Sequence, residues 1–207
     1  MAERRGGRPA PQTDTTITGA DWDGRDLGGD DTFERVLFTN CDFIEVRNSG
    51  ATFTDCTFRN VKFNASEHRD AAFVNCTFTR CNFFDATFER CKMVGSMFDD
   101  CSFDIVKIVG GDWSFTGLPG SDLTSASIVG TRMREADLTF ARCAGAVLRD
   151  LDLSGAWWHG ADLTGTDLRG TDLAALDPTD VQLAGAIITI AQTITIAEAL
   201  RLDVRVD

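Results

Sequence analysis

The residues of this 207-residue sequence that could do chemistry begin with seven cysteines. Cys76 and Cys81 are separated by four residues, not by the two of a zinc-binding C-x2-C pair. No secretory signal is expected, because no apolar stretch follows the arginines at the N-terminus. We therefore predict reduced thiols that pack as small apolar side chains, in a cytoplasmic protein without a metal site.

The two histidines and the paired carboxylates add no catalytic pattern. His68 and Asn48 lie 20 residues apart at otherwise apolar positions, and we expect a local bulge there. His159 follows Trp158 and is expected to face solvent. No nucleophile or carboxylate is placed by the sequence beside either imidazole, so no triad is indicated. Calcium-loop and phosphate-loop spacings are absent, and we predict no catalytic residue and no cofactor.

A repeat of five residues positions these side chains. Large apolar residues recur at every fifth position from Phe33 to Ile188 without a slip. The exceptions among these centres are Asn48, His68, Cys143 and Pro178. Small residues recur two positions earlier and include Cys41, Cys56, Cys76, Cys81, Cys91 and Cys101. Neither a helix nor a flat strand has this period. A chain with positions i and i−2 inward must turn a corner every five residues, and four corners close a square coil.

The repeat resembles the pentapeptide-repeat family, whose consensus is Ala-Asp/Asn-Leu-x-x. The segments that carry the resemblance are ADLTG (161–165), TDLRG (166–170) and CTFTRCNFFDATFERC (76–91). SEHRDAAFVNCTF (66–78) and ATFERCKMVGSMFDDC (86–101) are similar to the mycobacterial fluoroquinolone-resistance members of that family. The resemblance implies an all-β solenoid, a right-handed quadrilateral β-helix of about eight 20-residue coils over residues 31–190. It also implies a homodimer that mimics duplex DNA and binds DNA gyrase, a type II topoisomerase.

The two ends of the chain depart from this frame. We expect residues 1–14 to be a disordered tail and residues 15–30 to form an irregular capping coil, because their repeat is one residue out of phase. Thr189 and Gln192 fit a capping box, which predicts a short helix, and residues 202–206 alternate like a short strand. Residues 191–207 are expected to form a dimerisation segment. Its expected contacts are Ile190, Ile194, Ala197, Leu200 and Leu202.

Carboxylates dominate the outward positions, and the net charge is −12. This balance argues against direct binding of nucleic acid, and no apolar run approaches the ~18 residues of a membrane span. Sorting the blocks by their place in the coil gives three acidic faces and one nearly neutral face. The residues expected to bind the partner are Asp42, Glu45, Asp85, Asp99, Asp100, Asp104, Asp122 and Asp162.

Two functions stay open at this point. The first is a non-enzymatic DNA mimic that binds DNA gyrase, modulates or inhibits it, and could confer resistance to quinolones or another gyrase poison. The alternative is a repeat scaffold for an unrelated protein partner, since fold alone does not fix function. An enzyme is a third class, but no residue pattern supports it. The unbroken frame leaves no room for the extruded loops of strongly protecting relatives, which favours inhibition over strong protection.

Overall fold

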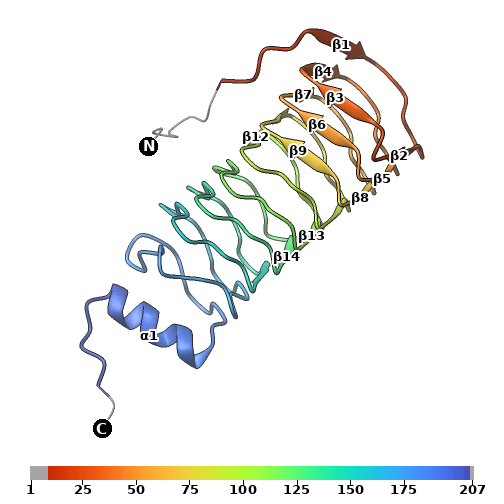
Figure 1. Cartoon of the computed structure of the whole chain (residues 1–207). Coiled ribbons are helices and arrows are strands. Elements are labelled where there is room, and N and C mark those ends of the chain that lie inside the picture. The colour runs from red at the N-terminus through yellow and green to blue at the C-terminus, as the bar shows by residue number, and fades with distance from the viewer. Residues whose placement is uncertain (1–8, 206–207) are drawn as a thin grey trace.

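The computed structural model describes residues 9–205, which wind into one solenoid of stacked coils (Figure 1). All strand pairs in this range are parallel, with single bridges between the remaining coils. The strands are β1 (Thr15–Thr18), β2 (Asp26–Gly28), β3 (Thr32–Glu34), β4 (Val36–Thr39), β5 (Arg47–Ser49), β6 (Thr52–Thr54), β7 (Thr57–Arg59), β8 (Glu67–Arg69), β9 (Ala72–Val74), β10 (Thr77–Thr79), β11 (Thr87–Glu89), β12 (Met97–Asp99), β13 (Lys107–Val109), β14 (Ser127–Val129) and β15 (Val147–Arg149). One helix, α1 (Ile190–Ala199), follows the coils of the described range.

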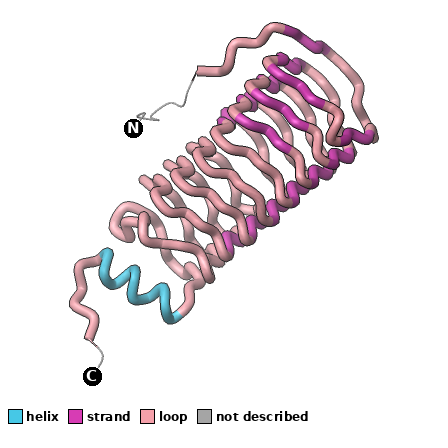
Figure 2. The backbone as a smooth tube through the Cα atoms, in the orientation of Figure 1, coloured by secondary structure: helices cyan, strands magenta, loops and turns pink. Residues whose placement is uncertain are grey.

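The solenoid has four faces, which we number by their inward centres. Face I runs from Phe33 to Leu173, face II from Phe38 to Pro178, face III from Phe43 to Leu183 and face IV from Asn48 to Ile188. Face II holds the sheet β1-β4-β7-β10-β12, face IV holds β2-β5-β8-β11-β13-β14-β15, and face I holds β3-β6-β9. Face III is joined by single bridges such as those of Lys62 with Asp42 and Asn82. Figure 2 shows that the continuous strands gather in the N-terminal coils and along one edge.

The strand register confirms the predicted solenoid. Phe78 lies directly between Phe58 and Phe98, one 20-residue coil away in each direction. In the first coil Ile17 pairs with Phe38, an offset of one residue more, which accommodates the phase shift seen in the sequence. Residues 20 positions apart therefore lie on the same face of adjacent coils.

The core is a set of aromatic ladders. The rings of Phe53 and Phe73 stack 4.7 Å apart, and those of Phe58 and Phe78 stack 4.8 Å apart. These separations match the ~4.8 Å between hydrogen-bonded strands, so each ring sits flat on the ring of the next coil. A tyrosine at a centre would bury its hydroxyl among rings, which gives a physical reason for 15 Phe and no Tyr.

Most corners have left-handed backbone at the fifth residue of the block. Besides glycines, Asn60 and Asp100 adopt φ of 52°, which their short polar side chains tolerate. Ile105 and Phe140 adopt φ of 52° and 56° without that advantage. The stacked coils fix these corners by hydrogen bonds, for example from Asn60 N to Thr79 O at 3.0 Å. Stacking therefore overrides the local preference of the residue.

The bulge expected at Asn48 and His68 is wrong. The two residues pair in register in β5 and β8, and Asn48 Nδ2 donates to His68 Nδ1 at 3.2 Å. His68 Nε2 lies 3.0 Å from Ser66 Oγ, which donates to Phe63 O at 2.7 Å. Asn48 Oδ1 accepts from Ala51 N at 2.9 Å. These donors and acceptors assign a neutral imidazole with its proton on Nε2, and the satisfied network needs no distortion of the wall.

The C-terminal helix begins with the predicted capping box, in which Gln192 N donates to Thr189 Oγ1 and Thr189 N donates to Gln192 Oε1. The Gln192 amide is buried and donates to Leu168 O and Thr171 O, each at 2.7 Å. It thereby satisfies carbonyls that would otherwise face a further coil. The strand expected at 202–206 is wrong for residues 202–205, which pair with no strand, because alternation alone cannot hold a strand without a neighbour. Val206 lies outside the described residues.

Candidate partner-binding surface

The thiols are enclosed by the coils, as predicted. All seven cysteines are free, six are buried, and Cys101 is half-buried. Burial raises the pKa of Cys143 to about 12 and that of Cys91 to about 11, so neither is a thiolate at neutral pH. No group of three or more His, Cys, Asp or Glu within residues 9–205 is arranged to hold a metal ion. The side chains of the described residues that a partner could contact are therefore those on the outer surface of the coils.

Three of the eight carboxylates expected to bind a partner are engaged by cations of the same chain. Asp42 Oδ2 lies 3.5 Å from Lys62 Nζ, and Asp122 Oδ2 lies 2.8 Å from Arg142, each one coil away. Asp85 Oδ1 lies 3.0 Å from Lys107 Nζ. The hydrogen bond from Arg142 is the main reason that the pKa of Asp122 is lowered. These pairs reduce the negative potential that faces III and IV present to a partner.

The other five have no ion pair within 4.0 Å in the described part of the chain. They are Glu45, Asp99, Asp100, Asp104 and Asp162. Asp99 lies on face II, Asp100 occupies the corner between faces II and III, and Asp104 lies on face III, all exposed. Asp162 is half-buried and accepts a hydrogen bond from Thr164 N at 3.0 Å, which lowers its pKa. Asp99, Asp100 and Asp104 thus form an uncompensated acidic corner between faces II and III.

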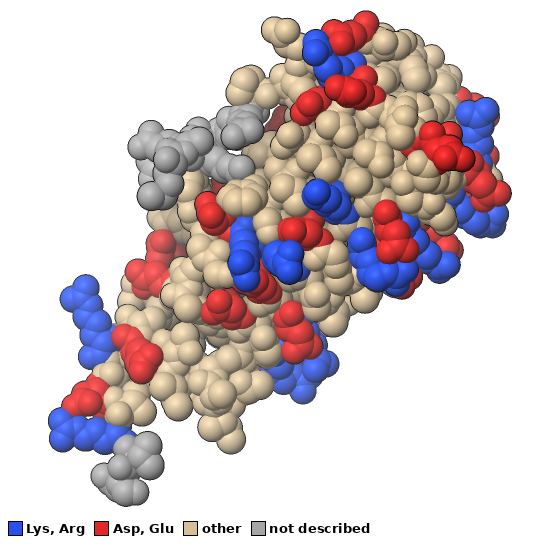
Figure 3. All heavy atoms as spheres, viewed as in Figure 1, with Lys and Arg blue, Asp and Glu red and all other residues tan. Residues whose placement is uncertain are grey.

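A second acidic group was missed by the sorting of blocks. The first coil carries Asp21, Asp23, Asp26, Asp30 and Glu34, which are exposed and have no ion pair within 4.0 Å in residues 9–205. The sorting began at residue 31 and so left out most of them. A count of charge along the chain, rather than around the coil, would have found this group. Figure 3 shows that many of the red side chains on the visible surface lie beside blue ones.

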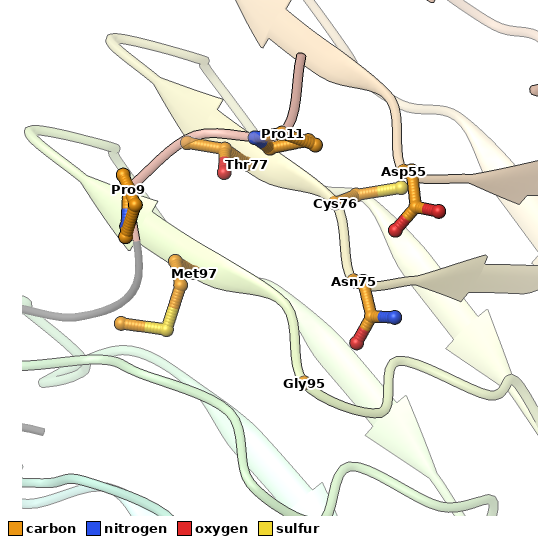
Figure 4. A pocket seen from close by; sticks show the side chains of 8 residues that line it. All are labelled: Pro9, Pro11, Asp55, Asn75, Cys76, Thr77, Gly95 and Met97. Atoms are coloured by element: carbon orange, nitrogen blue, oxygen red, sulfur yellow. The ribbon is translucent and has the colours of Figure 1, made fainter. Parts of the chain in front are cut away.

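The N-terminal segment lies against one corner of the solenoid. Asp14 N donates to Arg35 O at 2.7 Å, and Asp14 Oδ1 lies 2.9 Å from Arg35 Nη2. Pro9 and Pro11 line a shallow hollow together with Asn75, Gly95 and Met97 (Figure 4). Residues 9–14 of the expected tail therefore cover part of the corner between faces I and II, and residues 1–8 lie outside the described residues.

The helix end presents the other expected surface. Ile190 is 90% exposed, and Ile194, Leu200 and Leu202 are also exposed, whereas Ala197 is half-buried. Ile196, on the other side of α1, packs against the core. The apolar side chains that do not cover the last coil therefore face outward, on a surface continuous with the end of the solenoid.

Comparisons with known proteins agree on the repeat. A family model described as pentapeptide repeat region matches residues 51–128, and a second, described as pentapeptide repeats (8 copies), matches residues 141–175, together more than half of the chain. No curated protein matches. No helix among the described residues is long and apolar enough to cross a membrane.

One solved structure, with a TM-score of 0.50, shows the same fold. Full-length QnrB1, a plasmid-mediated fluoroquinolone resistance protein, is 21% identical with a TM-score of 0.50, over 89% of this chain and 99% of that one. A trypsin-treated variant of QnrB1 is 16% identical with a TM-score of 0.49, over 94% and 99%. HetL, involved in heterocyst differentiation regulation in the cyanobacterium Nostoc sp. strain PCC 7120, is 17% identical with a TM-score of 0.32, over 88% and 90%. Identities this low describe the fold alone.

Proposed function

The chain belongs to the pentapeptide-repeat family, and we propose that it is a non-enzymatic, cytoplasmic DNA mimic that binds DNA gyrase and inhibits or modulates it. The proposal is supported by its resemblance to quinolone-resistance members of the family and by the uncompensated corner formed by Asp99, Asp100 and Asp104. Carboxylates on a rigid rod can steer association with a basic groove and complement its Lys and Arg side chains. No covalent step is needed for this action.

The charge of the rod sets the kind of mimicry. Eight layers at ~4.8 Å give a length of about 38 Å, over which duplex DNA carries about 22 charges. The net charge of the whole chain is −12, and several carboxylates are neutralised by Lys and Arg of neighbouring coils. The proposed mimicry is therefore of the shape and sign of a duplex, at a lower charge density. We propose that binding is concentrated at the uncompensated corner instead of spread along all faces.

We propose that the protein is a homodimer whose two copies contact each other through their C-terminal ends. Ile190 and Ile194 of α1, with Leu200 and Leu202 after it, expose apolar area at the end of the solenoid. Burying that area against a second copy would join two rods end to end and lengthen the acidic surface. In this arrangement the acidic first coils of the two copies lie at the outer ends.

The decisive experiment is a gyrase supercoiling assay with purified protein, with and without a quinolone. We expect wild-type protein to inhibit supercoiling, and the triple variant Asp99→Asn, Asp100→Asn, Asp104→Asn to inhibit weakly while keeping the fold. The matched control is Glu67→Gln, Asp70→Asn, Glu89→Gln, which removes the same charge from face IV and its corner. If both variants lost inhibition equally, the net charge of the protein, and not the position of the acidic corner, would be responsible for binding. Wild-type protein that leaves supercoiling unchanged would favour the alternative, a scaffold for an unrelated partner.

The dimer is tested separately by light scattering. Ile190→Asp and Leu202→Asp replace exposed apolar side chains and leave the buried Gln192 amide in place, so folding should be kept. We expect the wild-type mass to be that of two chains and the double variant to be a monomer. A double variant with the wild-type mass would place the contact elsewhere.

A further inference from the structure

An exposed tryptophan lies between two carboxylates on face II. Trp157 is 40% exposed and pairs in register with Asp137 of the preceding coil. Asp177 occupies the same position one coil later. Trp157 thus has a carboxylate residue, Asp137, bridged to it one layer of about 5 Å away. On the other side residues 157 and 177 form no bridge, and Asp177 Oδ1 accepts from Thr179 N at 2.9 Å and from Thr179 Oγ1 at 2.6 Å. The partner-binding residues expected from the sequence do not include these three.

Asp137 is a buried carboxylate that has a hydrogen-bond donor but no neighbouring cation in the described part of the chain. It is only 5% exposed, and its Oδ1 accepts a hydrogen bond from Thr139 N at 3.0 Å. No lysine, arginine or histidine of the described residues lies within 4.0 Å of it, in contrast to Asp112, Asp122 and Asp152 on other coils. A buried carboxylate without a cation is costly, and a cation brought by a partner would lower that cost.

A second aromatic group continues the same surface. The ring of Phe140 is 59% exposed and lies over Gly160, where an added Cβ would collide with the ring. The Phe140 ring also contacts His159 edge to face, with centroids 5.0 Å apart. His159 lies two residues after Trp157, in the turn that follows it, and its Nδ1 lies 2.7 Å from Asp180 Oδ2. The surface therefore alternates aromatic rings and carboxylates.

We propose that Trp157, with Asp137 and Asp177, is a receptor for an arginine side chain of a partner protein. A guanidinium can stack its plane on the indole and donate from its edge to carboxylates at the same time. A lysine ammonium is a compact, strongly hydrated charge and cannot make both contacts in this way. The proposal deepens the function proposed above, because it gives the basic partner an anchoring point on face II that the acidic corner alone lacks.

The first test uses no gyrase. An oligoarginine peptide and an oligolysine peptide of equal length are titrated into the full chain, and the indole N–H signal of Trp157 is followed by NMR. The signal is assigned by its loss in Trp157→Leu. We expect the arginine peptide to shift this signal and to bind about tenfold more weakly to Trp157→Leu. Asp137→Asn, which keeps the acceptor for Thr139 N, should weaken the same peptide to a similar degree.

The control is Phe84→Leu, which removes an exposed ring from face III and should leave the binding of the arginine peptide unchanged. Equal binding of both peptides, or wild-type affinity of Trp157→Leu for the arginine peptide, would overturn the proposal.

The second test measures how the affinity for gyrase depends on salt concentration. Trp157→Leu should weaken binding without changing the salt slope, whereas the Asp99, Asp100, Asp104 variant should flatten it. Gyrase binding that fails while arginine-peptide binding persists refutes the proposed function and leaves the receptor intact.

Discussion

Acid should destabilise this protein through one buried imidazole. His68 is packed between Asn48 and the ring of Phe88, whose centroid is 4.7 Å away, and burial lowers the pKa of His68 to about 3. In the unfolded chain the pKa is near 6.5. Between these values the unfolded state binds a proton that the folded state does not, so stability falls as the pH falls from about 6.5 toward 3.

The size of this effect follows from linkage. Each pH unit within the window costs about 1.4 kcal/mol, which gives a loss of roughly 2 kcal/mol between pH 7 and pH 5. The geometry explains why the ring resists protonation. A proton on Nδ1 would face the Asn48 Nδ2 donor, and turning the Asn48 amide would remove the acceptor that Ala51 N uses. The ring packs against Phe63, Phe73 and Phe88 and is hydrogen-bonded to the uncharged Asn48 and Ser66, so burial is the cause of the lowered pKa.

The assay is urea unfolding at pH 7, 6 and 5, followed by circular dichroism, on wild-type protein and on the double variant Asn48→Leu, His68→Phe. Surface carboxylates lose their pairs equally in both chains, so the difference between the two isolates His68. We expect the wild type to lose about 2 kcal/mol more than the double variant between pH 7 and pH 5. Parallel losses in the two chains, or His68 ring signals that titrate above pH 5 in NMR, would refute the reasoning.

Three further outcomes are expected. Phe78→Asp should prevent folding, seen as loss of the β signal in circular dichroism, because a carboxylate would be buried between Phe58 and Phe98; a folded variant would contradict the aromatic ladder. The cysteines should react slowly with a thiol reagent in native protein and quickly after denaturation; Cys101, half-buried, should react first, and fast labelling of most thiols would argue against the packing. Gln192→Leu should cost about 1–3 kcal/mol in urea unfolding, because Thr171 O loses its side-chain donor and Leu168 O keeps only its bond from Thr171 N; an unchanged midpoint would contradict the capping role.

The fold could be predicted because the period of five fixes which side chains point inward. Phe58, Phe78 and Phe98 had to share a face once four corners closed a coil, and the structure places them in register. The corners at Ile105 and Phe140 could not be predicted from local preference, because only the hydrogen bonds of neighbouring coils impose left-handed backbone on such residues. The spacing of 20 residues places Asn48 beside His68, but it does not show that the two side chains satisfy each other's hydrogen bonds, so the expected bulge is wrong.

The candidate surface was predictable only in part. Adding 20 to a residue number finds its neighbour on the next coil, so the pairs of Asp42 with Lys62 and Asp122 with Arg142 were already present in the sequence. The pair of Asp85 with Lys107 crosses a corner and depends on how two long side chains bend. The partner-facing role of Trp157 was invisible to a search for charge, since its position matters through the carboxylates above and below it.

The constant 20-residue step between paired residues also governs how such a protein can change its length. Deleting one residue between 31 and 190 would turn every later core side chain outward. Deleting five would keep the core side chains inward but move every later residue to the neighbouring face. Gain or loss of a whole coil keeps every face in place and alters the length by ~4.8 Å. The first coil departs from this rule, with Ile17 opposite Phe38. Duplication of whole coils can therefore extend the rod in fixed increments, while substitutions at outward positions change the surface of each face without changing the length.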